Sequence, residues 1–253
     1  MLIHQIWYQG IDNIPQKYRE YRTKWMQLHP YTTFKLWDST DILQLIKCEF
    51  PSELAWFNSL PKMIQKIDVA KIFIIYAYGG AYIDIDTYPI KSIEPLFNNT
   101  HVIVGETGHP IHIKLIIHTL FNIRSGNLIN NNVIIAPKHH PFIKDYIIQL
   151  RESCMSFQPT FLDWFIPTLT IMNTTGPCHI TRAIEKTDHK VIVFGIDELV
   201  TDNTTGTNSY IVHTSDKTWV EPQTKLLYHL LIFAKYFVIA LICILLYKYF
   251  KNT

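Results

Sequence analysis

The feature that most constrains the fold of this chain is a helical pattern that passes directly into a strand pattern near residue 80. Over residues 64–78 apolar side chains recur at helical spacing, which predicts a helix packed against a core. Its apolar stripe consists of Ile67, Ala70, Ile74 and Ala77. Gly79-Gly80 closes this helix, because glycine readily adopts the positive φ at which helices end. A strand is predicted to start at once.

That strand, predicted over residues 81–86, ends in two aspartates. Side chains alternate between the faces of a strand, so Asp84 and Asp86 share one face, with Ile83 and Ile85 on the other. Two carboxylates this close repel each other unless a cation lies between them. The pair therefore indicates a site for Mg²⁺ or Mn²⁺, hard ions that keep coordination positions open for a diphosphate. The alternative is two exposed carboxylates at the edge of a sheet.

Elsewhere in the chain, strand patterns alternate with helix patterns, which is typical of an α/β protein. Strands are predicted over residues 3–7, 34–37, 101–104, 132–136, 191–194 and 210–213. Helices are predicted over residues 18–28, 41–48 and 53–58. With no repeat and no linker in view, we assign residues 1–222 to one domain.

Charge and cysteine content exclude several classes of protein. Lys and Arg number 23 against 21 Asp and Glu, a net charge of +2, which lacks the broad positive field of a nucleic-acid-binding protein. We therefore expect no nucleic-acid partner. The four cysteines form no Cys-x-x-Cys pair, so neither a zinc knuckle nor a disulfide framework is encoded.

A membrane segment is predicted near the C-terminus. Residues 226–247 are 22 in number, and at about 1.5 Å per residue they could cross a hydrocarbon core of roughly 30 Å. Lys235 is close enough to one end to extend to the interface, and residues 248–253 form a short basic tail. The alternative is an amphipathic helix on a membrane or on the domain. Lysines flank both ends, so the side on which the domain lies is left open.

Several segments together resemble the sugar-nucleotide glycosyltransferases of family 32. This family is typified by the yeast initiating α-1,6-mannosyltransferase and the inositol-phosphoceramide mannosyltransferases. The similarity is carried by residues 66–71, Lys-Ile-Asp-Val-Ala-Lys, and by residues 78–86, Tyr-Gly-Gly-Ala-Tyr-Ile-Asp-Ile-Asp. It extends to Ile3-His4-Gln5-Ile6-Trp7, to His140-Pro141 and to Thr175-Gly176-Pro177. The glucosyltransferase domain of the large clostridial toxins is similar as well.

The resemblance implies a fold, a reaction and partners. The fold would be GT-A, a Rossmann-like mixed sheet flanked by helices. The reaction would be metal-dependent transfer of a hexose, with retention at the anomeric carbon, from a GDP- or UDP-linked sugar to a glycan or lipid-linked acceptor. Mn²⁺ or Mg²⁺ would be the cofactor. Together with the predicted membrane helix, this points to a single-pass protein of a Golgi or ER-type membrane.

The resemblance also assigns roles to individual residues. Asp86 would ligate the metal, Asp84 would contact the ribose or the metal through water, and His213 would complete the metal site. Imidazole is a reasonable ligand for Mn²⁺. The alternative for His213 is a histidine that merely ends a strand.

Four further residues are predicted to contact the donor. Trp7 would stack on the base, Asp68 would bind sugar hydroxyls, and Asn131 would lie near the sugar. Lys71 stands where the family usually has Arg, and it lacks the planar fork of a guanidinium, which puts the donor choice or the rate in doubt. The alternatives are a core tryptophan at Trp7, and for Asp68 and Lys71 an ion pair on a solvated helix face.

Two other functions remain open from the sequence. A phosphatase of the haloacid-dehalogenase class would use Asp84 as nucleophile and Asp86 as acid, but that class expects the pair after the first strand, with Thr or Val where Tyr88 stands. A membrane-anchored binding protein that keeps the glycosyltransferase scaffold without its turnover is the second alternative, and Lys71 is the main argument for it.

Overall fold

The computed structural model describes residues 1–97, 100–108, 111–124, 126–202, 208–216, 220–227, 229–230 and 233. Its strands are β1 (Leu2–Ile6), β2 (Thr33–Trp37), β3 (Gly80–Ile83), β4 (Thr87–Pro89), β5 (Val102–Thr107), β6 (Leu128–Ala136), β7 (Val191–Phe194), β8 (Val200–Thr201) and β9 (Ile211–His213). Its α-helices are α1 (Gln16–Leu28), α2 (Ser39–Glu49), α3 (Leu54–Ser59), α4 (Met63–Tyr78), α5 (Ile111–Phe121), α6 (Pro141–Ser156), α7 (Phe161–Phe165), α8 (Pro167–Thr174) and α9 (Pro177–Lys186).

The strands form a mixed six-stranded sheet and a small three-stranded sheet. The main sheet has the order β2-β1-β3-β6-β5-β7, and the small sheet has the order β4-β9-β8. In the main sheet β1 runs parallel to β2 and β3, whereas β6 is antiparallel to β3 and β5. The predicted α/β class and mixed sheet are therefore confirmed. The small sheet was not predicted.

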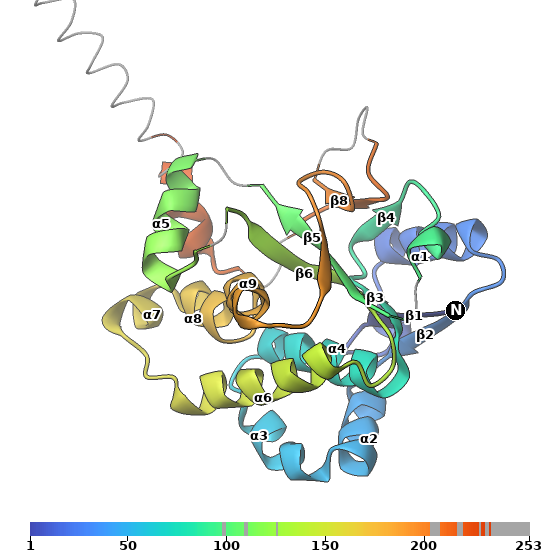
Figure 1. Cartoon of the computed structure of the whole chain (residues 1–253), viewed down its shortest axis with the longest axis horizontal. Coiled ribbons are helices and arrows are strands. Elements are labelled where there is room, and N and C mark those ends of the chain that lie inside the picture. Colours follow the sequence, from blue (N-terminus) through green and yellow to red (C-terminus); the bar gives the residue numbers. More distant parts are fainter. Residues whose placement is uncertain are drawn as a thin grey trace, which may run out of the picture.

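Each face of the main sheet is covered by different elements. Tyr82 points into a core formed with α2, α3, α4, α6 and α9. Ala81 and Ile83 point to the opposite face, where α1 and the small sheet cover them. Figure 1 shows the first set of helices on one side of the sheet and α1, β4 and β8 on the other. Because successive side chains of β3 point to opposite faces of the sheet, the strand contributes to two separate cores.

Helix α4 is more deeply buried than its predicted stripe indicates. Val69, Ile72, Phe73 and Ile75 lie outside that stripe and are as buried as the residues within it, whereas Ile67 is only half-buried. An α-helix that is apolar on all sides belongs in the interior. The predicted helix is confirmed, and Ala70, Ile74 and Ala77 of the predicted stripe are buried, but the burial extends well beyond that stripe.

The two glycines after α4 are required by space as well as by conformation. Gly79 has a φ of +66° and Gly80 one of +94°. A Cβ on Gly79 would lie 2.5 Å from the backbone nitrogen of Lys138, and one on Gly80 would overlap the carbonyl oxygen of Leu2. The chain can therefore turn from α4 into β3 here only with glycine at both positions.

Strand β3 is shorter than the sequence predicted. It ends at Ile83, and a turn leads to β4, which begins at Thr87. Ile85 does not continue the apolar face of Ile83 but packs with Ile14 and Tyr18 in a separate cluster. The prediction that Asp84 and Asp86 share a face of one strand was therefore wrong.

The predicted membrane helix over residues 226–247 lies largely outside the described residues. Within the part of the chain that is described, we find no helix with the length and apolar character needed to cross a bilayer. The division at residues 222 and 248 and the membrane helix itself stay predictions.

Candidate active site

A cleft of about 860 Å³ opens where β1 and β3 end, next to α4 and β6. One part of its wall is polar, whereas the other is apolar and includes Ile113, Ile117 and Met172. All the residues with a predicted role in donor or metal binding line this cleft, namely Trp7, Asp68, Lys71, Asp84, Asp86, Asn131 and His213. They come from segments more than 200 residues apart in the sequence, from Trp7 to His213.

The turn after β3 positions the two aspartates. The backbone N–H of Asp84 donates to the carbonyl oxygen of Asn132 at 2.8 Å, which extends the pairing of β3 with β6 by one residue. The hydroxyl of Tyr82 donates to Oδ1 of Asp84 at 2.7 Å. The hydroxyl of Thr87 donates to the backbone oxygen of Asp84 at 2.6 Å and closes the turn. Asp84 is thus held from three sides.

The small sheet brings His213 to the aspartates. His213 ends β9 and pairs with Thr87, the first residue of β4. Its Nε2 lies 3.2 Å from Oδ2 of Asp86, and the ligand atoms of Asp84, Asp86 and His213 all lie within 4.8 Å of one another. Burial by itself would lower the pKa of His213, but its bonds to Asp202 and Asp86 outweigh that effect and raise the pKa to about 10. Without a metal the protonated imidazole balances the two carboxylates, and a metal ion would take the place of that proton, because only a neutral imidazole nitrogen can ligate it.

These three side chains fit a divalent cation. Burial raises the pKa of Asp84, and the nearby charge of Asp86 raises it further, although Lys71 acts in the opposite direction. Two carboxylates that repel each other in this way would be relieved by a metal ion. The set of carboxylate oxygen and imidazole nitrogen suits Mn²⁺, and two carboxylates suit Mg²⁺.

Asp68 and Lys71 form a buried polar network beside the aspartates. Nζ of Lys71 lies 2.9 Å from Oδ1 of Asp68 and 3.7 Å from Oδ1 of Asp84. Asp68 also accepts from Nδ2 of Asn131 and from the hydroxyl of Thr175, both at 3.0 Å. The side chains of Lys71 and Asp68 are only 3% and 5% exposed. The alternative of an ion pair on a solvated helix face is therefore wrong.

Strand β6 presents its asparagines to the cleft through an irregularity in its pairing. Ile103 of β5 pairs with Ile135, but Gly105 pairs with Asn130, so β6 carries extra residues between these points. Such a bulge re-aims side chains and is common next to active sites. Asn132 is 1% exposed, and neither its Oδ1 nor its Nδ2 has a partner within the described residues. A buried amide without partners is costly unless a ligand supplies them.

Trp7 has a mixed environment. It lines the cleft and also packs against Tyr18, with ring centroids 5.7 Å apart. Its Nε1 is buried and has no partner among the described atoms. Trp7 therefore packs against the core and lines the cleft at the same time.

Sequence reasoning missed three polar residues of this site. Tyr82 and Asn132 were given no role, and Thr175 was quoted only as part of a similar segment. The position of Tyr82, two residues before Asp84 on a strand, was a usable signal because such residues share a face. Thr175 had no such signal, since it reaches Asp68 across 107 residues of sequence.

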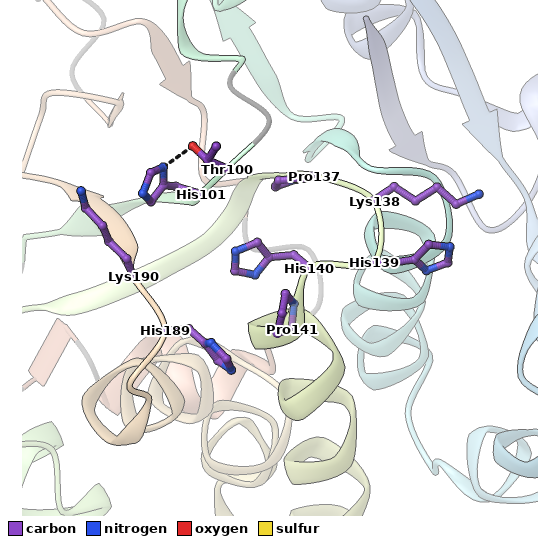
Figure 2. Close-up of a pocket in the computed structure, with 9 residues that line it drawn as sticks. All are labelled: Thr100, His101, Pro137, Lys138, His139, His140, Pro141, His189 and Lys190. Carbon is purple, nitrogen blue, oxygen red and sulfur yellow. Dashed lines mark hydrogen bonds between the residues drawn. The ribbon is translucent and has the colours of Figure 1, made fainter.

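A second, smaller pocket of about 440 Å³ lies at the opposite edge of the main sheet, where β6 ends and β5 and β7 begin. Figure 2 shows His101, His140 and His189 around it, together with Lys190. His140 accepts from the backbone of Phe142 and caps α6, and His189 bonds to Asp145. The described residues that line the pocket include no carboxylate, so it does not resemble the metal site of the main cleft.

Comparison with known proteins points to glycosyltransferases. Residues 15–103 match the family described as a glycosyltransferase sugar-binding region containing DXD motif. Inositol phosphoceramide mannosyltransferase 3 of Schizosaccharomyces pombe is 28% identical over 180 residues, which cover 71% of this chain and 43% of that protein. The initiation-specific alpha-1,6-mannosyltransferase of Candida albicans is 31% identical over 107 residues, 40% of this chain and 28% of that protein. The predicted resemblance is confirmed.

These relatives differ from the chain in length. The chain spans less than half the length of the first curated relatives that it matches. Among solved structures, the PaToxG glycosyltransferase superposes with a TM-score of 0.49 at 15% identity, covering 73% of this chain and 68% of that one.

Proposed function

We propose that this chain, a relative of the DXD-containing glycosyltransferases, transfers a hexose from a GDP- or UDP-linked sugar with the help of a divalent cation. The observation that carries the proposal is the cluster of Asp84, Asp86 and His213 beside the network of Asp68 and Lys71 in one cleft. A cation site next to a set of hydrogen-bonding groups is what binding of a sugar diphosphate requires. The mixed sheet is compatible with the GT-A fold that the resemblance implies.

Asp86, Asp84 and His213 would hold the cation, which would neutralise the charge that develops on the leaving diphosphate. Asp84 is pre-oriented for this by its bond from Tyr82. Lys71 lies within ion-pair distance of the carboxylates of Asp68 and Asp84 and balances their negative charge in a buried setting. Each of these roles is one that the side chain can perform from its position in the structure.

The sugar and the base would bind on either side of the aspartates. Asn131 donates its amide N–H to Asp68, which leaves its carbonyl oxygen to accept from a sugar hydroxyl. Trp7 offers a nucleobase an aromatic face and an N–H that has no partner among the described residues. We assign no carboxylate as a covalent nucleophile, so the acceptor would attack on the face from which the diphosphate leaves, with retention.

The names of the relatives and the apolar wall of the cleft bear on the acceptor. One relative is named an inositol phosphoceramide mannosyltransferase and another an initiation-specific alpha-1,6-mannosyltransferase. The apolar wall of the cleft, which includes Ile113, Ile117 and Met172, favours an acceptor carried by a lipid. Together with the predicted membrane helix, this suggests a membrane of the Golgi or ER type as the location.

The experiment is a screen of UDP- and GDP-sugars for donor hydrolysis without acceptor, in Mn²⁺ and in excess chelator. We expect hydrolysis of one donor that stops when the chelator removes the metal. Asp86→Asn should abolish it, because a metal ligand is lost, whereas Glu94→Gln, the same change on an exposed turn away from the cleft, should not. No hydrolysis and no thermal shift with any donor would instead favour a binding protein without turnover.

A further inference from the structure

Helix α7 exposes almost all of its apolar side chains. Phe161 and Trp164 are 75% and 76% exposed, and Leu162 and Phe165 are exposed by about half. The one charged residue of the helix, Asp163, is engaged within the fold, because it bonds to Thr160 in a capping box and accepts from Thr170 of α8. The helix therefore presents a largely aromatic surface that few polar side chains interrupt. Such a surface is unusual for a face in contact with water.

Helix α5 is apolar on both of its faces. Ile113 and Ile117 face the cleft, whereas Ile111 and Leu115 are 68% and 61% exposed on the outside, with Leu120 half-exposed. Residues 111–121 contain no carboxylate. Lys114, the one lysine of α5, is engaged within the fold, because its Nζ bonds to Asn127. The exposed apolar side chains of the outer face have no apolar partner among the described residues.

The last described helical residues repeat this arrangement. Leu226, Leu230 and Phe233 follow each other at spacings of four and three, which places them on one helical face, and all three are exposed. Lys225 and His229, on other faces of the helix, line the cleft. The helix thus separates the cleft from an outer apolar face.

Helix α8 contacts α5 and α7 and bonds to the residue that precedes the last helical residues. Ile117 and Phe121 of α5 pack with Met172 of α8. Thr170 of α8 bonds to α7 through Asp163, and Thr168 of α8 bonds to Glu221 just before the last helical residues. Figure 1 shows α5, α7 and these C-terminal helical residues at the same end of the molecule, away from α1 and β2. They form one apolar face.

We propose that this apolar face, formed by α5, α7 and the helical residues Leu226, Leu230 and Phe233, docks on a lipid bilayer. Phenylalanine and tryptophan are the side chains that amphipathic surfaces bury at the boundary between headgroups and acyl chains. The sequence beyond Phe233 supports lipid as the occupant, because residues 236–247 contain no charged residue and start only three positions after Phe233. A second copy of the chain would not account for that continuity.

The docked orientation would open the cleft at the membrane surface. Ile113 and Ile117 of α5 form one side of the cleft and Lys225 and His229 contribute to its lining, so its mouth lies beside the docking face. An acceptor embedded in the bilayer could then reach the aspartates without leaving the lipid. This last step rests on the proposed function, whereas the docking itself does not.

Bromine quenching of Trp164 tests the docking without any assay of transfer. The full chain is reconstituted in phosphatidylcholine vesicles whose acyl chains carry bromine, and its fluorescence is compared with that in unbrominated vesicles. We expect quenching, because Trp164 would lie among the acyl chains. Trp164→Phe should remove most of the quenching, and Trp56→Phe, which changes a core tryptophan 7% exposed, should leave it.

Two results would overturn the proposal. One is equal quenching of the parent and of Trp164→Phe, or none in either, which would mean that α7 does not meet lipid. The other is a dimer in detergent that dissociates in Phe161→Ser/Trp164→Ser but persists in Ile11→Ser/Tyr31→Ser, a control that changes exposed apolar residues outside this face. That outcome would assign the face to a second copy. Loss of docking with donor hydrolysis retained would leave the proposed function standing.

Discussion

Lys71 is a buried cation that balances the negative charges of two carboxylates. Its ammonium group lies between Asp68 and Asp84, and it also donates to the backbone oxygen of Asn131 at 3.1 Å. Burial opposes its charged form, but the charges of Asp84 and Asp68 outweigh this and raise its pKa. A lysine suits such a position, since a compact point charge fits between two carboxylates where a planar fork would need more room.

Removal of the Lys71 charge should therefore destabilise the fold. For Lys71→Met we expect the free energy of unfolding to fall by about 3–5 kcal/mol, because two buried carboxylates lose their partner. Lys71→Arg keeps the charge but needs more room for its planar fork, so it should lose stability too, though less than Lys71→Met. Urea unfolding of both variants measures the difference, and a Lys71→Met protein as stable as the parent would contradict the role that we assign to this residue.

Asn132 offers a second test at the scale of a residue. Its side-chain amide has no partner within the described residues although it is buried. Asn132→Leu should thus leave the free energy of unfolding unchanged or raise it by about 1 kcal/mol, since no hydrogen bond is lost. The thermal shift caused by the nucleotide-sugar donor should shrink if the amide binds that ligand. A Leu variant with lower stability and an unchanged donor response would show that the amide is structural.

At the scale of elements, the turn between α4 and β3 sets the geometry of the site. It directs β3 along β1 and β6, and Asp84 and Asp86 follow four and six residues after Gly80. Helix, turn and strand were predicted correctly because each depends on local patterns of apolar residues and glycine. The end of β3 was not, since it depends on where β6 stops pairing and the small sheet begins.

Glycine substitutions separate conformation from space at this turn. Gly79→Ala and Gly80→Ala should each cost more than about 1–3 kcal/mol, because strain at positive φ adds to an overlap with backbone. Gly10→Ala is the matched control, with a φ of +86° but nothing within 4 Å of the added Cβ. It should cost only the conformational part. Equal losses at all three positions, measured by thermal unfolding, would show that the close approach is unimportant.

The buried histidine of β1 predicts a pH dependence. Trp37 donates to Nδ1 of His4, whose Nε2–H bonds to the carbonyl oxygen of Gly79. Burial lowers the pKa of His4 from 6.5 to about 4, although the bond to Gly79 acts in the opposite direction. Between these values the unfolded chain binds a proton that the folded chain does not. Stability is therefore complete above pH 6.5 and is lost as the pH falls toward 4.

The size of that loss follows from the shift. His4 alone should account for about 3 kcal/mol at pH 4, at 1.36 kcal/mol per pKa unit. The free energy of unfolding in urea, measured from pH 7 to pH 4, should fall less steeply in His4→Gln than in the parent. His139→Gln, a change at an exposed histidine, serves as the control. Parallel pH profiles for His4→Gln and the parent would contradict this prediction.

At the scale of the molecule, the candidate metal site joins the two sheets. Asp84 and Asp86 follow β3 of the main sheet, whereas His213 belongs to β9 of the small one. The two sheets also share a core, because Ile211 of β9 packs with Ile83 of β3. A ligand held by all three side chains would therefore stabilise the arrangement of the whole molecule rather than one element.

Metal removal tests this connection. If Mn²⁺ binds only the folded chain, saturation at 100 times its dissociation constant should add about 2.7 kcal/mol to the free energy of unfolding, and excess chelator should remove that gain. Asp86→Asn should unfold at the same temperature with and without Mn²⁺, whereas Glu94→Gln should behave as the parent. A thermal shift that persists in Asp86→Asn would locate the ion elsewhere.

The amino-acid sequence by itself determined the α/β class, the helix that ends in two glycines, and the pair of aspartates that indicates a cation site. These features depend on residues that are close in the chain, where periodicity and backbone conformation leave a pattern. Tertiary structure alone decided that Lys71 is buried rather than solvated and that the amide of Asn132 has no partner within the described residues. It also brought His213, which only the resemblance had indicated, to Asp86 across 127 residues. Those outcomes depend on strand pairing and burial, which short strands such as β4 and β9 do not encode in their own few residues.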